Sequence, residues 1–369
     1  MTDSRIEKLA NILVDYSTGV KPGDRVAIET ITVAEPLVRA LYERVLERGG
    51  QPHILLHLPD EEQIFYARAS EAQLDYTPVF QQMVTEQFDV YIRARAETNT
   101  RALNDVDPVR QSRYQKAYAP IRNSMLRRSA EKTMRWVLSQ YPTQAYADEA
   151  GMTLEEYENF IYQACYAGPE TLDPVENWQK VQKRQSRIIQ RIEGHDRVTL
   201  RGPDVDLSLS IKGRTFLNSC GHHNMPDGEI YTGPVENTLN GWVRYTYPAI
   251  HQGRFVEGIE LTFKDGRVVQ ASAKKNEAFL LKMIDSDPGA RYVGEFAIGT
   301  NDQIQRFTSN ILFDEKIGGT FHMALGTGYP ETGSQNRSVI HWDMICDMRH
   351  DAEIAVDGEV VYRNGKFLF

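Results

Sequence analysis

The sequence predicts two domains, an N-terminal α/β domain with a mainly parallel sheet and a β-rich α+β C-terminal domain that carries a metal site. The chain has 369 residues, more than one hydrophobic core usually serves. Short apolar strands alternate with amphipathic helices in the first half, and short strands separated by turns fill the second half. We therefore place the domains at residues 1–190 and 191–369, with the boundary within residues 180–195.

The first domain repeats the order strand, helix, strand, which favours a parallel sheet with helices on its faces. Strands, the second of them expected to be buried, are predicted at residues 25–29, 52–58, 88–92 and 134–138. Helices are predicted at residues 4–17, 34–48, 60–86, 106–130 and 153–166. Thr153 and Glu156 have the spacing of a capping box at the start of the last of these helices.

Two further patterns in this half bear on function. No GxGxxG or GxxxxGK[ST] motif follows the first strand, so neither a dinucleotide site nor a P-loop is indicated. The basic tract at residues 179–197 places Val181, Ile188 and Ile192 at helical spacing. We interpret it as a helix with a solvated basic face.

The second domain begins where the chain changes to period-two alternation at Val198. The expected strands are VTLRG, VDLSLSI, RTFLNS, WVRYTYPA, RFVEGIELTF and RVVQASA, separated by turns such as KGR, HQGR and KDGR. A helix is expected near residues 276–285, and a C-terminal hairpin should turn at Asn364 and Gly365.

Composition excludes several classes of partner. A formal net charge of −9 argues against a nucleic-acid or anionic-membrane surface, because both need clustered Lys and Arg. No stretch approaches the roughly 18 to 20 apolar residues of a membrane span, and residues 1–19 are too polar for a signal peptide, so we expect a cytoplasmic protein. Cys165, Cys220 and Cys346 lack CxxC spacing and are expected to be buried and free.

Residues with metal-ligand side chains concentrate in four segments of the second domain. These are 224–234 with Asp227 and Glu229, 294–301 with Glu295, the glycine-rich run 313–331, and 340–343. His341 and Asp343 are separated by one residue, so in a strand both side chains point to the same face and can meet one ion. The alternative is a structural histidine that hydrogen-bonds to an aspartate.

A pair of adjacent divalent ions needs about five or six ligands. The four segments supply Glu229, Glu295, Glu315, His322, His341 and Asp343. The absence of a thiolate from this set favours two hydrolytic Zn²⁺, Co²⁺ or Mn²⁺ ions over a structural zinc. His222 and His223 precede the first segment, and because neighbouring strand residues face opposite ways, at most one of them can join the site.

At these residues the sequence resembles the M29 family of metalloaminopeptidases, the aminopeptidase T and aminopeptidase S group. The matching segments are NMPDGEIYTGP, VGEFAIG, NILFDEKIGGTFHMALGTGYPE and NRSVIHWD, and KPGDRVAIE and AGMTLEEYENFIYQACY extend the likeness along the whole chain. The resemblance implies a dinuclear centre with Glu229, Glu295, Glu315, His322, His341 and Asp343 as metal ligands. It also implies that Tyr329 is the active-site tyrosine, and that the chain forms a homodimer whose active site faces an internal cavity.

The expected reaction is metal-assisted hydrolysis of the N-terminal bond of peptides with a free N-terminus. Glu295 or Glu315 is the expected general base, Tyr329 the expected hydrogen-bond donor to the oxyanion, and Glu331 a wall or surface residue. One alternative keeps the fold and uses His322, His341 and Asp343 for a single Fe²⁺ ion of a ring-cleaving oxygenase. Another is a non-catalytic dimer stabilised by metal.

Overall fold

The computed structural model describes residues 3–251 and 253–369, and the chain divides into two compact units. The first contains the described residues up to Trp178 together with Gly221–Pro226, and the second contains Gln179–Cys220 and Asp227–Phe369. The expected domain boundary between residues 190 and 191 stays a prediction. None of the helices in the described part is long and apolar enough to cross a membrane.

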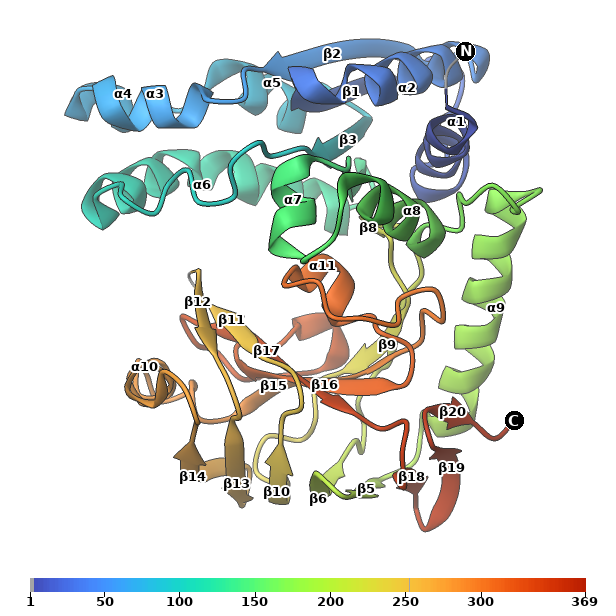
Figure 1. Ribbon diagram of the computed structural model, residues 1–369, viewed down its shortest axis with the longest axis vertical. Coiled ribbons are helices and arrows are strands. Elements are labelled where there is room, and N and C mark those ends of the chain that lie inside the picture. Colours follow the sequence, from blue (N-terminus) through green and yellow to red (C-terminus); the bar gives the residue numbers. More distant parts are fainter. Residues whose placement is uncertain (1–2, 252) are drawn as a thin grey trace. The chain divides into compact units, whose positions relative to one another are not determined.

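The first unit is built on a parallel sheet with strand order β2-β1-β3-β4-β8 (Figure 1). Its strands are β1 (Arg25–Ile31), β2 (Gln51–His57), β3 (Val90–Arg95), β4 (Arg135–Gln140) and β8 (Asn224–Met225). From β1 the chain passes to β2 on one side, and then returns across β1 to form β3 on its other side. The expected α/β domain with a parallel sheet is confirmed.

Helices connect these strands. They are α1 (Ser4–Asn11), the π-helical turn η1 (Ile12–Ser17), the 3₁₀ turn η2 (Thr32–Ala34), α2 (Glu35–Glu47), α3 (Glu61–Arg68), α4 (Glu71–Leu74), α5 (Val79–Gln87), α6 (Pro108–Ala130), α7 (Gln144–Glu149) and α8 (Leu154–Ala164). The predicted capping box of α8 is present, because the side chains of Thr153 and Glu156 each bond to the other's backbone N–H. The basic tract forms the end of α9 (Pro174–Ile192), where Val181, Ile188 and Ile192 are buried as expected.

The prediction of a buried second strand is wrong. Among the described residues β2 pairs only with β1, and it therefore lies at an edge of the sheet. Ile54 and Leu56 have 47% and 41% of their surface exposed. An apolar run does not distinguish a central strand from an edge strand whose face the chain leaves uncovered.

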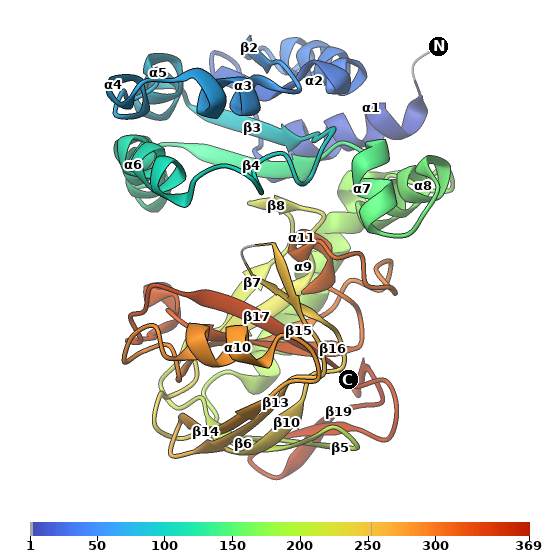
Figure 2. The ribbon, with the colours of Figure 1, turned by 60° about the vertical axis from the view of Figure 1, so that its left-hand side comes forward.

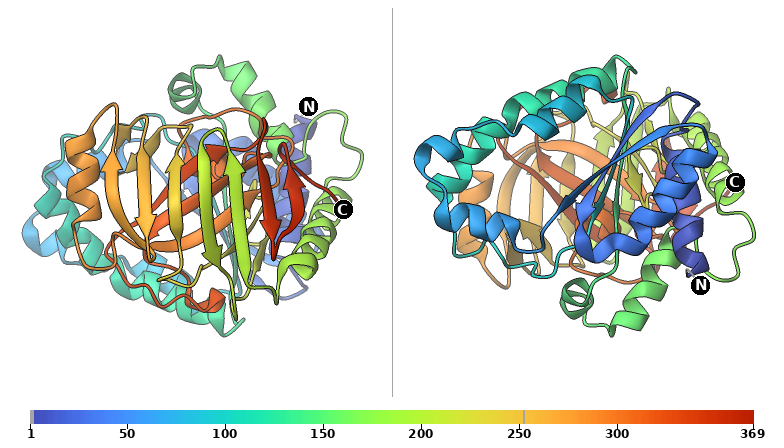
Figure 3. Two further views of the ribbon diagram at one scale, coloured as in Figure 1. Left: turned by 90° about the horizontal axis from the view of Figure 1, so that it is seen from below. Right: turned by 90° about the horizontal axis from the view of Figure 1, so that it is seen from above.

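The second unit contains two antiparallel sheets that share one hydrophobic core (Figures 2 and 3). The larger has the order β14-β13-β10-β6-β5-β18-β19-β20 and the smaller the order β17-β16-β15-β9-β7, with a separate β11-β12 hairpin. The strands of the larger sheet are β5 (Arg197–Gly202), β6 (Val205–Ser210), β10 (Asn240–Arg244), β13 (Glu260–Lys264), β14 (Arg267–Ser272), β18 (Glu353–Val356), β19 (Glu359–Arg363) and β20 (Lys366–Phe367). The others are β7 (Leu217–Ser219), β9 (Glu229–Thr232), β11 (Ala249–His251), β12 (Arg254–Val256), β15 (Val293–Gly299), β16 (Thr320–Gly326) and β17 (His341–Asp347). These antiparallel sheets confirm the expected β-rich second half.

Short helices and turns complete this unit. They are α10 (Glu277–Ile284), α11 (Ile311–Asp314) and the 3₁₀ turn η3 (Pro330–Thr332). The predicted turn at Asn364–Gly365 joins β19 to β20, and a second turn of the same kind at Asp357–Gly358 joins β18 to β19. Gln252, in the expected HQGR turn, lies outside the described residues.

Candidate metal centre

The smaller sheet of the second unit has one apolar face and one face that carries carboxylates and imidazoles. Directly opposed residues in a sheet point to the same face, as do residues two apart along one strand. Ala324 lies opposite Glu295 on one neighbouring strand and opposite Asp343 on the other. His322 is two residues from Ala324 and His341 is two residues from Asp343, so these side chains share the same face. The intervening residues fill the core: Ile230, Phe296, Ile298, Phe321, Met323, Leu325, Trp342, Met344 and Cys346.

Small residues keep the polar face open. Ala297 of β15 is the partner of His322, Ala324 of β16 lies between Glu295 and Asp343, and Gly299 is the partner of Glu229. Because neighbouring strands are only about 4.8 Å apart, larger side chains at these positions would fill the space between the donors. The sheet thus presents a row of ligand-type side chains around an uncrowded centre.

A β-bulge directs Glu295 to this face. Val293 pairs with Leu325 but Glu295 pairs with Ala324, so Gly294 is an extra residue in β15. The bulge reverses the alternation, and Val293 therefore packs in the core while Glu295 faces the donors. A Cβ at Gly294 would collide with the backbone oxygen of Gly326, which explains the glycine.

Glu295 is the central donor because its two oxygens face different imidazoles. Oε1 lies 3.6 Å from Nε2 of His322, and Oε2 lies 3.3 Å from Nε2 of His341. On the outer sides, Oε2 of Glu229 is 3.3 Å from the His322 nitrogen, and Oδ1 of Asp343 is 3.5 Å from the His341 nitrogen. The four strands therefore supply a continuous chain of donors from Glu229 to Asp343.

The orientation of the imidazoles suits cation binding. Nδ1 of His341 donates a hydrogen bond of 2.8 Å to the carbonyl of Thr327, which leaves Nε2 as the lone-pair nitrogen of the neutral ring. The Oε2 atom of Glu229 is buried and has no hydrogen-bond partner. A buried carboxylate oxygen without a hydrogen-bond partner, surrounded by other potential metal ligands, fits a bound cation better than a closed network of hydrogen bonds.

Three overlapping groups of donors have ligand atoms within 4.8 Å of one another. They are Glu229 with Glu295 and His322, then Glu295 with His341 and Asp343, and finally Glu315 with His322 and Asp343. All six expected donors are therefore brought together. Within the described residues, the set His322, His341 and Asp343 expected for a single iron is not one of these groups.

Burial and mutual charge control protonation in the cluster. Burial raises the pKa of Glu229 to about 8. Burial also opposes ionisation of Asp343, but the neighbouring His341 prevails and lowers that pKa to about 2. Burial disfavours imidazolium ions, yet the surrounding carboxylates raise the pKa of His322 to about 9 and of His341 to about 12. In the absence of an ion, protons on the imidazoles thus offset the carboxylates, and a divalent ion would displace them.

Lys316 is a member of the cluster that the sequence reasoning missed. Its side chain is fully buried, its Nζ lies 3.3 Å from Oε1 of Glu229, and it forms a short ion pair with Glu315. Once a cation has displaced the protons, the four carboxylates would carry four negative charges against this one ammonium, and that excess favours divalent cations. A lysine directly after a ligand-type glutamate in FDEKIGG was the available signal.

Other residues near the cluster have local roles. Asp227 accepts hydrogen bonds from Ser219 and from the backbone of Gly228, so Glu229 and not Asp227 faces the donors. Gln185 of α9 donates to the carbonyl oxygens of Ser219 and Glu229 and so fixes the start of β9. This contact was not predictable from the sequence, because Gln185 lies in the basic tract that was interpreted as a solvated helix face.

The aromatic wall of the centre includes the expected tyrosine. The ring centroid of Tyr329 lies 5.4 Å from that of His341 and 5.3 Å from that of Tyr231. Burial raises the pKa of Tyr329 above its usual range, so the hydroxyl is a donor at neutral pH. Glu331 is exposed, as expected, and His222 and His223 belong to the first unit and to none of the donor groups.

Comparison with known proteins places this geometry in context. The chain is 26% identical to aminopeptidase 2 of Geobacillus stearothermophilus, with 100% of this chain and 98% of that protein covered. It is 26% identical to aminopeptidase T of Thermus aquaticus, over 96% of this chain and 94% of the relative.

Two solved structures share the fold. The wild-type AmpT structure from Thermus thermophilus matches with a TM-score of 0.83 at 22% identity, over 99% of both chains. The 2,5-dihydroxypyridine dioxygenase from Pseudomonas putida KT2440 matches with a TM-score of 0.58 at 13% identity, over 98% of this chain and 96% of that one. The family described as thermophilic metalloprotease (M29) matches residues 2–367. With this match along nearly its whole length, the chain belongs to the M29 peptidase family.

Proposed function

We propose that the protein is a metal-dependent aminopeptidase that hydrolyses the N-terminal bond of peptides at a dinuclear centre. Membership of the M29 family and the likeness to named aminopeptidases support the reaction class. The observation that carries the dinuclear assignment is the position of Glu295, whose two oxygens face two different imidazoles. A carboxylate in that position suits a bridge between two ions.

We assign the donors to two ions on this basis. Glu229, Glu295 and His322 would hold one ion, and Glu295, His341 and Asp343 the other. Carboxylate and imidazole ligands suit Zn²⁺, Co²⁺ or Mn²⁺. When bound, such a pair supplies Lewis acidity and a water molecule activated near neutral pH.

Glu315 is left for proton transfer. Glu315 forms the third group of ligand atoms together with His322, which is assigned to the first ion, and Asp343, which is assigned to the second. The carboxylate of Glu315 therefore lies beside a ligand of each ion. Of the two glutamates expected as general base, Glu295 would help to hold both ions, which leaves Glu315 to accept a proton from water. The ammonium of Lys316, paired with Glu315, holds this carboxylate in place.

Tyr329 stabilises the oxyanion in this proposal. Its ring lies beside that of His341, and 41% of the surface of Tyr329 is exposed, so the side chain is open to a substrate. A neutral phenol donates a hydrogen bond to the negative oxygen that develops on the scissile carbonyl.

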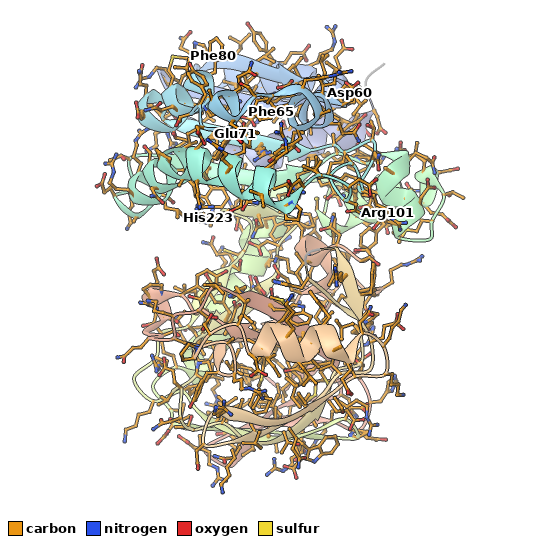
Figure 4. All side chains as sticks on the ribbon, turned by 90° about the vertical axis from the view of Figure 1, so that its left-hand side faces the viewer. Asp60, Phe65, Glu71, Phe80, Arg101 and His223 are labelled. Atoms are coloured by element: carbon orange, nitrogen blue, oxygen red, sulfur yellow. The ribbon has the colours of Figure 1, made fainter. Side chains whose placement is uncertain are left out.

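We also propose that the protein is a homodimer that uses the β2 edge. β2 has an unpaired side, and Ile54, Leu56 and Leu58 expose apolar surface at alternate positions. Phe80 of α5 is 62% exposed, and Figure 4 shows it at the outer surface of the first unit. Leu56→Lys should reduce the mass measured by light scattering to that of one chain, and an unchanged dimer mass would exclude this edge. Localisation in the cytoplasm stays a prediction.

The function is tested with aminoacyl p-nitroanilides and peptides, each with a free or an N-acetylated terminus. The metal-loaded protein should hydrolyse only the free form, and His341→Ala should remove this activity. His195→Ala is the matched control, because His195 pairs with the exposed Asp357 outside the donor cluster. Full activity of a folded His341→Ala variant, or equal hydrolysis of acetylated substrates, would contradict the proposal.

A further inference from the structure

A cavity lies in the first unit between the sheet and the helices α5 and α6. It has a volume of about 210 Å³ and is lined by Glu29 of β1, by Tyr91 and Arg93 of β3, and by residues of the two helices. The three sheet residues lie within their strands, so the cavity lies against one face of the sheet. Both helices are labelled in Figure 2.

The floor of the cavity is an acidic group with remaining capacity to accept hydrogen bonds. Glu29 is buried, and its Oε2 accepts a hydrogen bond of 2.9 Å from the hydroxyl of Tyr91. The nearest cationic nitrogens to Oε1 are Nε2 of His57 at 3.6 Å and Nε of Arg93 at 3.7 Å. Although burial opposes ionisation, these neighbours hold the pKa of Glu29 below its usual range.

Positive charge is supplied to the cavity by Arg122 of α6. Arg122 lines the same cavity, its side chain is exposed, and it forms no ion pair or hydrogen bond with any residue in the described part of the chain. Arg93 adds a second guanidinium on the sheet. Val84, Ile121 and Met125 form an apolar side of the cavity between these charges.

The volume limits the size of the ligand. A cavity of about 150 Å³ accommodates benzene, with its six carbon atoms. By the same ratio, 210 Å³ holds about eight non-hydrogen atoms. A nucleotide or dinucleotide is therefore too large, and a single amino acid is of the right size.

We propose that this cavity binds a free α-amino acid with an aliphatic side chain. Its ammonium group contacts Oε1 of Glu29, its carboxylate contacts Arg122 and Arg93, and its side chain packs on Ile121 and Met125. A simple anion would meet the buried carboxylate, and a simple cation would meet two guanidinium groups, so only a molecule with both charges satisfies the lining. The inference goes beyond the proposed hydrolysis and is independent of it, because no donor of the metal centre lines the cavity.

Calorimetric titration of L-leucine into the full-length, metal-loaded protein tests the proposal. We expect a binding event that weakens at least tenfold in Arg122→Gln and is lost in Met125→Trp, which fills the apolar side. Arg127→Gln is the matched control, because Arg127 is an exposed arginine of α6 that pairs with Glu131 and does not line the cavity. Hydrolysis of aminoacyl p-nitroanilides should be unchanged in Arg122→Gln, which separates this cavity from the metal centre.

A ligand series identifies the charges that are recognised. 4-Methylpentanoate lacks the ammonium group and 3-methylbutylamine lacks the carboxylate, and each should bind at least tenfold more weakly than leucine. Neither has an amide bond that the metal centre could hydrolyse. Equal binding of 4-methylpentanoate or of inorganic phosphate would reveal a plain anion site and overturn the proposal. The absence of a binding event up to about 10 mM leucine, or leucine affinity equal in wild type, Arg122→Gln and Met125→Trp, would also overturn it.

Discussion

Replacing Ala324 by valine tests whether the donor cluster needs the open space at its centre. Ala324 is fully buried and lies directly between Glu295 and Asp343 in the sheet. Both carboxylates approach Nε2 of His341, at 3.3 Å and 3.5 Å. Valine is favoured in strands, so the substitution changes the site and leaves the strand intact.

The size of the effect follows from contact distances. The added methyl groups need about 3.5 to 4.0 Å to each neighbouring heavy atom, and the flanking strands are only about 4.8 Å away on either side. Glu295 and Asp343 must therefore move apart around His341. Such overpacking costs about 1 to 3 kcal/mol, which corresponds to a loss of metal affinity of about fivefold to 150-fold.

Competition with a chelator of known affinity measures this loss, and the thermal midpoint in excess chelator checks the fold. Ala271→Val is the matched control, since it makes the same change in β14 of the larger sheet. We expect weaker metal binding and lower activity for Ala324→Val, with a midpoint in chelator equal to that of the control. Wild-type metal affinity and activity in Ala324→Val would refute the argument that the cluster needs a small side chain at this position.

Three further predictions concern Tyr329, Lys316 and His57. Tyr329→Phe should lower kcat by about 10²-fold with unchanged metal content, and wild-type kcat would remove the tyrosine from the mechanism. Lys316→Met should destabilise the metal-free protein by about 3 to 5 kcal/mol, because buried carboxylates lose their cation. The metal-loaded form should lose less, and equal losses in chelator and in metal would count against this. The carboxylate of Glu29, whose Oε1 lies 3.6 Å from Nε2 of His57, prevails over burial and raises the pKa of His57 from 6.5 to about 9. The contribution of protonated His57 to the stability of the folded protein is therefore present below pH 6.5 and is lost as the pH rises through 9. His57→Gln should cost about 1 kcal/mol at pH 6, after allowance for solvent screening, and the cost should vanish near pH 10; a pH-independent difference in thermal midpoint would contradict it.

The fold and the placement of His341 beside Asp343 were predictable because they rest on local patterns, whereas the full list of ligands rested on the resemblance to the M29 family. Alternation of strands and helices indicated the parallel sheet, and Thr153 with Glu156 marked the start of α8. The one-residue spacing of His341 and Asp343 placed both on one face of β17, as the structure shows. Each of these inferences needs only the period of one element.

The remaining features depend on contacts between distant segments. The side of the sheet that Glu295 faces is set by the bulge at Gly294, and a strict alternation from Val293 would have turned it into the core. Lys316 became part of the cluster only because β9 brings Glu229 to it. The exposure of Ile54 depends on which strands flank β2, which the apolar run itself does not encode.

Elemental analysis of the purified protein, with the activity of the same sample, tests the central claim most directly. The account predicts two Zn, Co or Mn ions per chain and hydrolysis of substrates with a free N-terminus. It further predicts that Glu295→Gln loses both ions, because one carboxylate serves both, while Glu331→Gln keeps both because Glu331 is exposed and outside the donor groups. A single iron per chain, or two ions retained in Glu295→Gln, would contradict the dinuclear aminopeptidase.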